Sequence, residues 1–132
     1  MVRKELFDKI GGFDKDIFMY AEESLLCRQT LKNMNYRICN VPSAHIIHFD
    51  GGSIGTLSEF KANAICDGNY LYYFKSFGSD EAIRYLKTFL RIYSRRMRLS
   101  SLFSKKRMTY YRILKNAYYS KLITISKSNY GF

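Results

Sequence analysis

The glycine pair Gly11-Gly12 constrains this 132-residue chain most, because it separates a short amphipathic segment from a loop rich in aromatic and acidic residues. Val2, Leu6 and Ile10 recur at four-residue spacing, which predicts a helix over residues 2–10. Glycine ends such a helix readily, because it adopts the left-handed conformation at low cost. The loop that follows, Phe13 to Ala21, is of the kind that often carries function when a rigid scaffold holds it.

Beyond this loop the pattern predicts one helix and two strands. Glu22 begins a predicted helix over residues 22–34, and its first-turn carboxylates are favoured by the helix dipole. Residues 36–41 alternate as a strand does, Pro42-Ser43 breaks the pattern, and residues 44–49 are rich in β-branched and aromatic side chains. This first region, residues 1–58, is therefore expected to contain a short sheet.

The second region, residues 59–132, is expected to be helical. A helical signal runs from about residue 57 to 77, interrupted near Asp67-Gly68 and ended by Gly78. A second helix begins near Ser79, where Asp80 and Glu81 provide first-turn acids. Residues 100–104 break this helix, a last helix covers about 106–124, and Ser126 begins an end that is expected to fray.

The net charge of +11 lies entirely in the second region. Residues 1–58 hold seven basic and seven acidic residues, whereas thirteen basic residues and no acidic one follow Glu81. Three interpretations remain open: a solvated surface, an anionic membrane surface, or a nucleic acid. The membrane is favoured, since basic amphipathic helices with Tyr and Phe suit anionic headgroups, and no base-reading motif accompanies the charge. Lys75 and Arg84 are expected to be solvated charges.

Composition excludes several classes. The three cysteines are an odd number without a CxxC pair, which argues against a disulfide framework or a zinc site and suits a reducing cytoplasm. No apolar run follows Met1 to Lys4, so we expect no signal peptide. No window approaches the roughly 18 apolar residues of a membrane-spanning helix.

Residues 3–53 resemble the motif that opens the C-terminal half of the catalytic domain in family 2 glycosyltransferases. The likeness is strongest to rhamnosyltransferase-like members that build bacterial surface polysaccharides. The matching residues follow the order and spacing of the family: Gly11 to Asp14, Phe18, Tyr20, Glu22, Leu26, Arg28, Val41 to Ala44, His48 and Gly51 to Ser53. The resemblance implies the C-terminal portion of a GT-A fold, a Rossmann-like α/β domain, followed here by basic helices.

The resemblance also implies a reaction and a site. The family transfers a sugar, with inversion, from a nucleotide-sugar donor to a glycan or lipid-linked acceptor, and uses Mg²⁺ or Mn²⁺ held by an Asp-x-Asp motif. Glu23 would be the base and Glu22 its orienting neighbour, while His48 would contact the donor or its metal. Acceptor binding would fall to Gly12, Phe13, Asp14 and Tyr20. Such an enzyme would be cytoplasmic and peripheral at the inner face of the plasma membrane.

Three departures from the family limit this expectation. Glu23 stands where the family has Asp, and a misplacement of about 1 Å can cost on the order of 100-fold in rate. Leu25 replaces a later Asp. The nucleotide-binding half with its Asp-x-Asp is absent, and Asp14-Lys15-Asp16 has the letters but lies within the acceptor motif. We therefore expect either a fragment of a longer enzyme or a gene shortened at its start, inactive and without bound metal when isolated. An unpaired sheet edge would favour oligomerisation.

Each candidate residue also has a structural alternative. Adjacent acids at a helix start, such as Glu22 and Glu23, often serve only to stabilise the helix dipole. His48 and His45 are of a type that is most often structural. Asp14 is as well suited to shape its own loop as to contact an acceptor.

Overall fold

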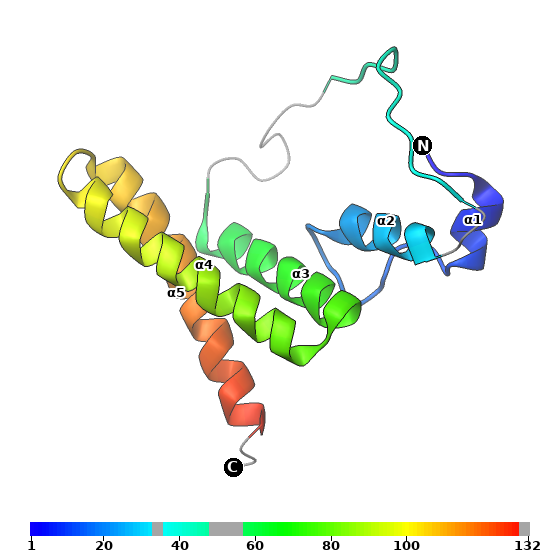
Figure 1. Cartoon of the computed structure of the whole chain (residues 1–132). Coiled ribbons are helices and arrows are strands. Elements are labelled where there is room, and N and C mark those ends of the chain that lie inside the picture. Colours follow the sequence, from blue (N-terminus) through cyan, green and yellow to red (C-terminus); the bar gives the residue numbers. More distant parts are fainter. Residues whose placement is uncertain (33–35, 48–56, 130–132) are drawn as a thin grey trace.

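The computed structural model describes residues 1–32, 36–47 and 57–129. All regular elements in these ranges are helices, as Figure 1 shows. Two short helices, α1 (Lys4–Lys9) and α2 (Glu22–Lys32), precede three long ones: α3 (Glu59–Phe77), α4 (Ser79–Ser101) and α5 (Lys105–Asn129). The long helices form one packed unit, and α2 lies against α3.

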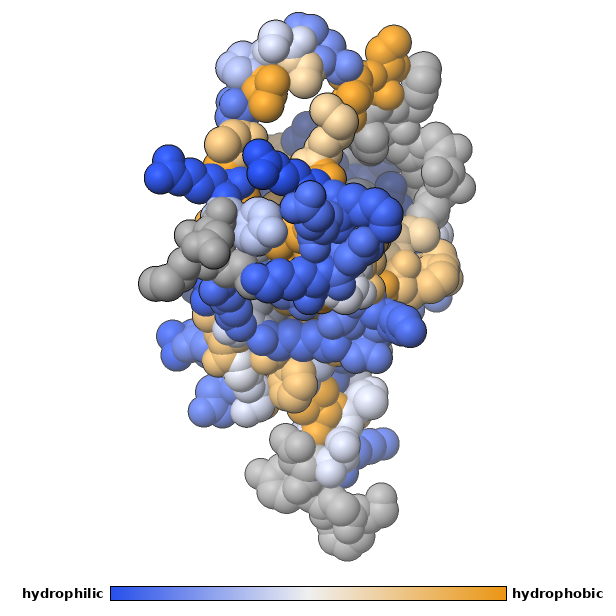
Figure 2. All heavy atoms as spheres, turned by 90° about the vertical axis from the view of Figure 1, so that its right-hand side faces the viewer, coloured by the Kyte–Doolittle hydropathy of each residue, from blue (hydrophilic) through white to orange (hydrophobic). Residues whose placement is uncertain are grey.

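The expected α/β fold with a short sheet is wrong for the described residues, because residues 36–47 form no strand. The predicted break at Pro42 is present as a turn, in which the Ala44 amide donates to the Val41 carbonyl at 3.0 Å. The two flanks do not pair, and residues 37–47 are all exposed, including Ile46 at 88%. A strand needs a partner and a face to bury. Figure 2 shows exposed apolar side chains at the top of the molecule, where this segment lies.

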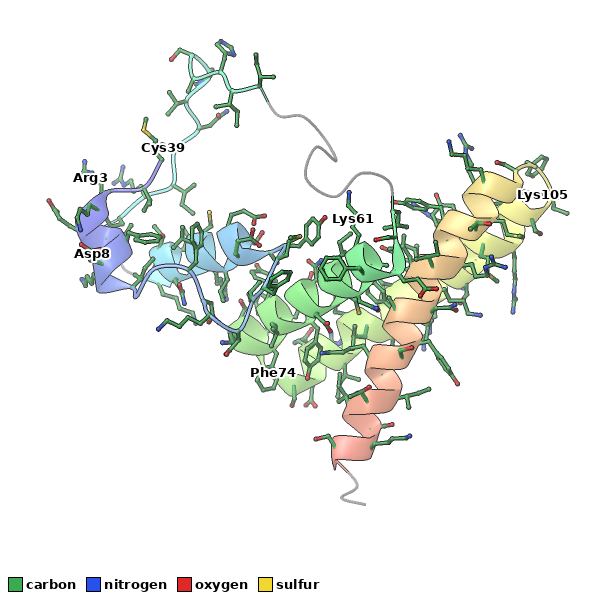
Figure 3. All side chains as sticks on the ribbon, turned by 180° about the vertical axis from the view of Figure 1, so that it is seen from behind. Arg3, Asp8, Cys39, Lys61, Phe74 and Lys105 are labelled. Carbon is green, nitrogen blue, oxygen red and sulfur yellow. The ribbon has the colours of Figure 1, made fainter. Side chains whose placement is uncertain are left out.

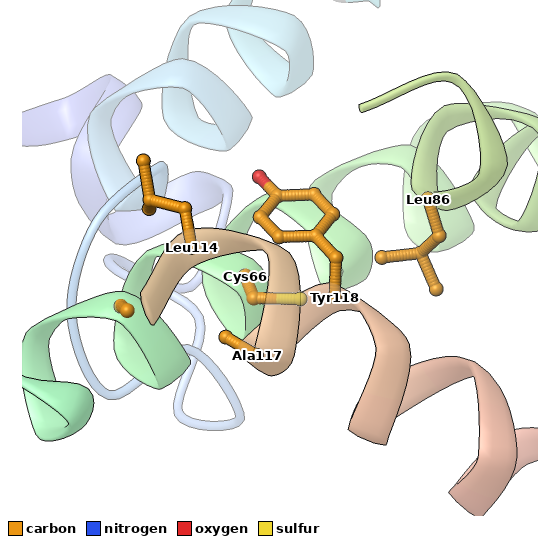
Figure 4. Close-up of a cluster of buried hydrophobic side chains, with 6 residues drawn as sticks. Cys66, Leu86, Leu114, Ala117 and Tyr118 are labelled. Atoms are coloured by element: carbon orange, nitrogen blue, oxygen red, sulfur yellow. The ribbon is translucent and has the colours of Figure 1, made fainter. Parts of the chain in front are cut away.

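The core lies where the three long helices meet. Its fully buried side chains include Cys66 of α3, Leu86 of α4 and Tyr118 of α5, each exposed by 1% or less (Figure 4). The helices bring apolar residues together because each repeats them at three- and four-residue steps. On α4 this stripe includes Leu86, which is fully buried.

Tyr118 is the centre of an aromatic cluster. Its ring lies 5.2 Å from that of Tyr93 and 5.9 Å from those of Tyr85 and Phe89, measured between centroids. The hydroxyls of Tyr118 and Tyr85 form a hydrogen bond of 2.8 Å. Burial raises the pKa of both phenols well above the ordinary value, and it raises the pKa of the nearby Cys66 thiol to about 12. All three groups therefore stay neutral at physiological pH.

Most helix boundaries follow their local signals. Gly78 has φ of 93° between α3 and α4, a conformation that favours glycine, and Ser58 caps α3 by accepting from the Lys61 amide. The expected interruption of α3 at Asp67-Gly68 is wrong, because the helix is continuous there. The last helix also extends beyond the expected fraying point to Asn129. None of the helices in the described ranges has the length and apolarity needed to cross a membrane.

Candidate functional site

The loop between α1 and α2 carries most of the residues predicted from the sequence, and ion pairs hold it on α3. Lys75 of α3 donates to both carboxylate oxygens of Asp14 at 2.8 Å and also pairs with Asp16. The Asp16 amide donates to Asp14 Oδ1 at 3.0 Å, which shapes the loop locally. The Lys75 side chain is only 27% exposed, so the expectation of a solvated charge is wrong for this residue. Arg84 is 72% exposed and pairs with Glu81.

These contacts shift the pKa values of both Asp14 and Lys75. The hydrogen bond from Lys75 holds the pKa of Asp14 below its ordinary value of 3.8. The same bond, with that to Asp16, raises the pKa of Lys75 above 10.5. The bound carboxylate therefore serves to fix the loop, which corresponds to the loop-shaping alternative for Asp14.

A second contact presses the end of the loop against the α3 backbone. A methyl group placed on Gly68 would lie 2.7 Å from the Met19 carbonyl oxygen and closer still to that of Tyr20. Gly68 therefore lies in the middle of a continuous helix because a side chain there would collide with the loop. Tyr20 and Ala21 both adopt left-handed backbone conformations, with φ of 67° and 68°. Such residues cost on the order of 1 kcal/mol each and persist only where surrounding contacts hold them.

The strained turn immediately precedes α2, whose first two residues are the carboxylates Glu22 and Glu23. The Ala21 carbonyl accepts the first helical hydrogen bond, from Leu25, at 2.9 Å. Glu22 is half-buried, and within the described part of the chain no donor reaches its buried Oε2. Glu23 is exposed and accepts a hydrogen bond of 3.3 Å from Ser24. The two acids thus differ: Glu23 is open to solvent, whereas Glu22 has one oxygen that is buried and unpaired.

The remaining predicted residues are dispersed. Gly12 has φ of 74° and packs against Phe7, and Phe13 is half-exposed with its ring edge-on to Phe7 at 5.4 Å. His48 lies outside the described residues, as do Gly51 to Ser53. Arg28, which also matches the family motif, places its guanidinium 4.5 Å from the ring centre of Phe77 and so joins α2 to α3.

A surface pocket of about 370 Å³ lies between the loop and the long helices. The loop contributes Asp16 and Phe18, α5 contributes Lys121, and α3 contributes most of the rest, including Phe60, Asn63 and Asp67. Phe18 and Phe60 are 78% and 58% exposed and meet edge to face at 6.2 Å. Lys121 forms an ion pair of 2.7 Å with Asp67 and also lies 5.0 Å from the ring centre of Tyr70.

None of the six predicted site residues that the structure describes lines this pocket. The sequence indicated this pocket only through the stretch of resemblance, residues 3–53, which includes Asp16 and Phe18. The α3 residues had no signal, because a contact between residues some forty positions apart leaves no local pattern. Nowhere in the described ranges do three or more His, Cys, Asp or Glu side chains gather as a metal site would require.

Replacing Lys75 with methionine is expected to release the loop from α3. Loss of the hydrogen bonds to a charged partner should lower the free energy of unfolding by about 1–2 kcal/mol. The Asp14 pKa is lowered in the folded state, so its contribution is present above pH 3.8 and is lost as the pH falls through the folded pKa. The Lys75 contribution is lost as the pH rises past its raised pKa above 10.5.

Urea unfolding at several pH values measures this effect. The parent chain should lose more stability than Lys75→Met between neutral pH and pH 3. Lys61→Met, which removes one positive charge from the same helix without breaking this ion pair, is the matched control. Equal stabilities and equal pH slopes for the two variants would show that the Lys75 pair does not form in solution.

Comparison of the chain with protein-family models, with curated proteins and with solved structures finds no match.

Proposed function

We propose that this chain provides the acceptor side of a sugar-transferring site and works at an anionic membrane surface. The observation that carries the proposal is the motif-bearing loop, which Lys75 and Gly68 hold on α3 beside a pocket of aromatic, carboxylate and amide groups. This combination suits a saccharide. Exposed rings offer apolar faces, and carboxylate and amide oxygens accept hydrogen bonds from hydroxyl groups.

Within the proposal the pocket binds the sugar and α2 supplies the base. Glu23, exposed at the start of α2, takes the proton from an acceptor hydroxyl. The oxygen of that hydroxyl meanwhile bonds to the anomeric carbon of the donor. The bond from that carbon to the nucleotide diphosphate breaks in the same step, and the diphosphate leaves with the electron pair. Glu22, its neighbour in the first turn of α2, orients Glu23 for this proton transfer.

Saccharide binding by the purified chain tests the proposal. Saturation-transfer NMR with the methyl glycosides of rhamnose, glucose and N-acetylglucosamine is expected to show binding of at least one of them, with a millimolar Kd. Phe18→Ala and Asp67→Ala should weaken this binding at least tenfold, because each removes one kind of contact in the pocket.

Phe103→Ala is the matched control, because it removes a similarly exposed phenylalanine that does not line the pocket. It should leave saccharide binding unchanged. Absence of binding for all three glycosides would overturn the acceptor role, as would binding that Phe18→Ala and Phe103→Ala weaken to the same extent.

A further inference from the structure

The turn between α4 and α5 carries the most exposed large apolar side chains of the described helical region, residues 57–129. Leu99, Leu102 and Phe103 are 62%, 74% and 86% exposed. Figure 1 shows this turn at the free end of the α4–α5 hairpin, away from α1 and α2. Figure 3 likewise places Lys105 at the end opposite Arg3 and Asp8. Neighbouring apolar side chains that project together from one end of a protein mark an interaction surface.

The same turn is surrounded by positive charge. Six exposed basic residues lie within thirteen positions and no acidic residue accompanies them: Arg95, Arg96, Arg98, Lys105, Lys106 and Arg107. Arg91, Arg95 and Arg98 also line one shallow pocket of about 360 Å³ on α4. Arginine guanidinium groups placed side by side in this way bind phosphate oxygens well.

The amides of Leu102, Phe103 and Ser104 in the turn are already hydrogen-bonded. They donate to carbonyls at the end of α4 at 2.8–3.3 Å. At the start of α5, the Ser104 hydroxyl accepts from the Arg107 amide, and its carbonyl accepts from the Met108 amide. Apolar insertion into lipid is costly when backbone groups lose water without a partner, and these groups keep their partners.

We propose that this turn is a membrane-docking tip, in which Leu102 and Phe103 insert into the headgroup region of an anionic phospholipid bilayer. The basic residues beside it bind lipid phosphates, so charge and apolar contact act at one place. A nucleic acid would use the positive charge but would leave the aliphatic Leu99 and Leu102 in water. The tip deepens the membrane location proposed above and does not depend on sugar transfer.

Tryptophan fluorescence of the full chain tests the tip, because the chain has no tryptophan of its own. Phe103→Trp should show a blue shift with vesicles of phosphatidylcholine containing about 30% phosphatidylserine, and no shift with phosphatidylcholine alone. Tyr119→Trp reports from an exposed position elsewhere on α5 and should show no shift with either vesicle.

Vesicle co-sedimentation of unlabelled variants separates the two contributions. Leu102→Ser with Phe103→Ser should reduce binding at least tenfold, whereas Tyr119→Ser with Ile123→Ser should not change it. Arg95→Gln with Arg98→Gln should also reduce binding at least tenfold, and more than Lys87→Gln with Lys127→Gln, which removes the same charge away from the tip.

The outcomes are distinguishable. If the parent chain does not bind anionic vesicles, or binds duplex DNA but not vesicles, the proposals of a membrane location and of a docking tip are both overturned. If the parent chain binds and the tip variants bind equally well, only the tip is overturned. Neither result affects the saccharide test, whose binding variants at Phe18 and Asp67 lie in the pocket between the loop and α3.

Discussion

Replacing Tyr118 with alanine is expected to lower the free energy of unfolding by about 4 kcal/mol, close to the whole stability of many small domains. Tyr118 is 1% exposed and contacts rings from α4, so its removal opens a cavity at the centre of the three-helix core. Because α3, α4 and α5 all contribute to this core, the loss should appear as cooperative unfolding of the helices. Urea titration followed by circular dichroism measures it.

Two further variants separate the causes. Tyr119→Ala removes the same atoms from the next position, where the side chain is 55% exposed, and should cost less than about 1 kcal/mol. Tyr118→Phe keeps the ring but removes the hydroxyl that pairs with Tyr85, and should cost about 1 kcal/mol. Similar losses for the alanine variants at 118 and 119 would contradict the described packing of α5.

Replacing Gly68 with alanine is expected to destabilise the protein, which reverses the usual effect of this substitution in a helix. Alanine favours a helix over glycine by about 1 kcal/mol. Here the new methyl group would collide with the Tyr20 and Met19 carbonyl oxygens, at an overpacking cost of about 3 kcal/mol. The expected net loss is therefore about 2 kcal/mol in urea unfolding, and amide exchange of residues 14–21 should become faster as the loop leaves α3.

Thr88→Ala provides the comparison, because it raises helix propensity at an exposed position of α4 and should be neutral or slightly stabilising. A gain in stability for Gly68→Ala would mean that the loop does not rest on α3. Unchanged amide exchange in residues 14–21 would mean the same.

The helical half of the fold could be predicted because its signals are local. The three- and four-residue steps along α4, the glycine at position 78 and the serine-containing break near residue 102 all act within a few residues of where they stand. The strands could not be predicted in the same way. Residues 36–47 have strand-like composition, but a strand exists only if another segment pairs with it, and none does so in the described ranges.

The candidate site divides similarly. The motif from Gly11 to Glu23 identified the loop and its acids from the sequence alone. It did not indicate that Lys75, 61 residues beyond Asp14, would bind that loop, or that Gly68 would receive it. It also did not separate the half-buried Glu22 from the exposed Glu23, because burial depends on what packs against the helix.

The sequence by itself determined the glycine turn, the long helices and the concentration of positive charge after Glu81, because each is a property of neighbouring residues. Only the tertiary structure decided that the loop is fixed on α3 and that residues 36–47 pair with no other segment in the described ranges. It also decided that the basic residues near the α4–α5 turn surround exposed apolar side chains. These features depend on contacts between distant parts of the chain, whose free energies are set by packing and burial rather than by local pattern.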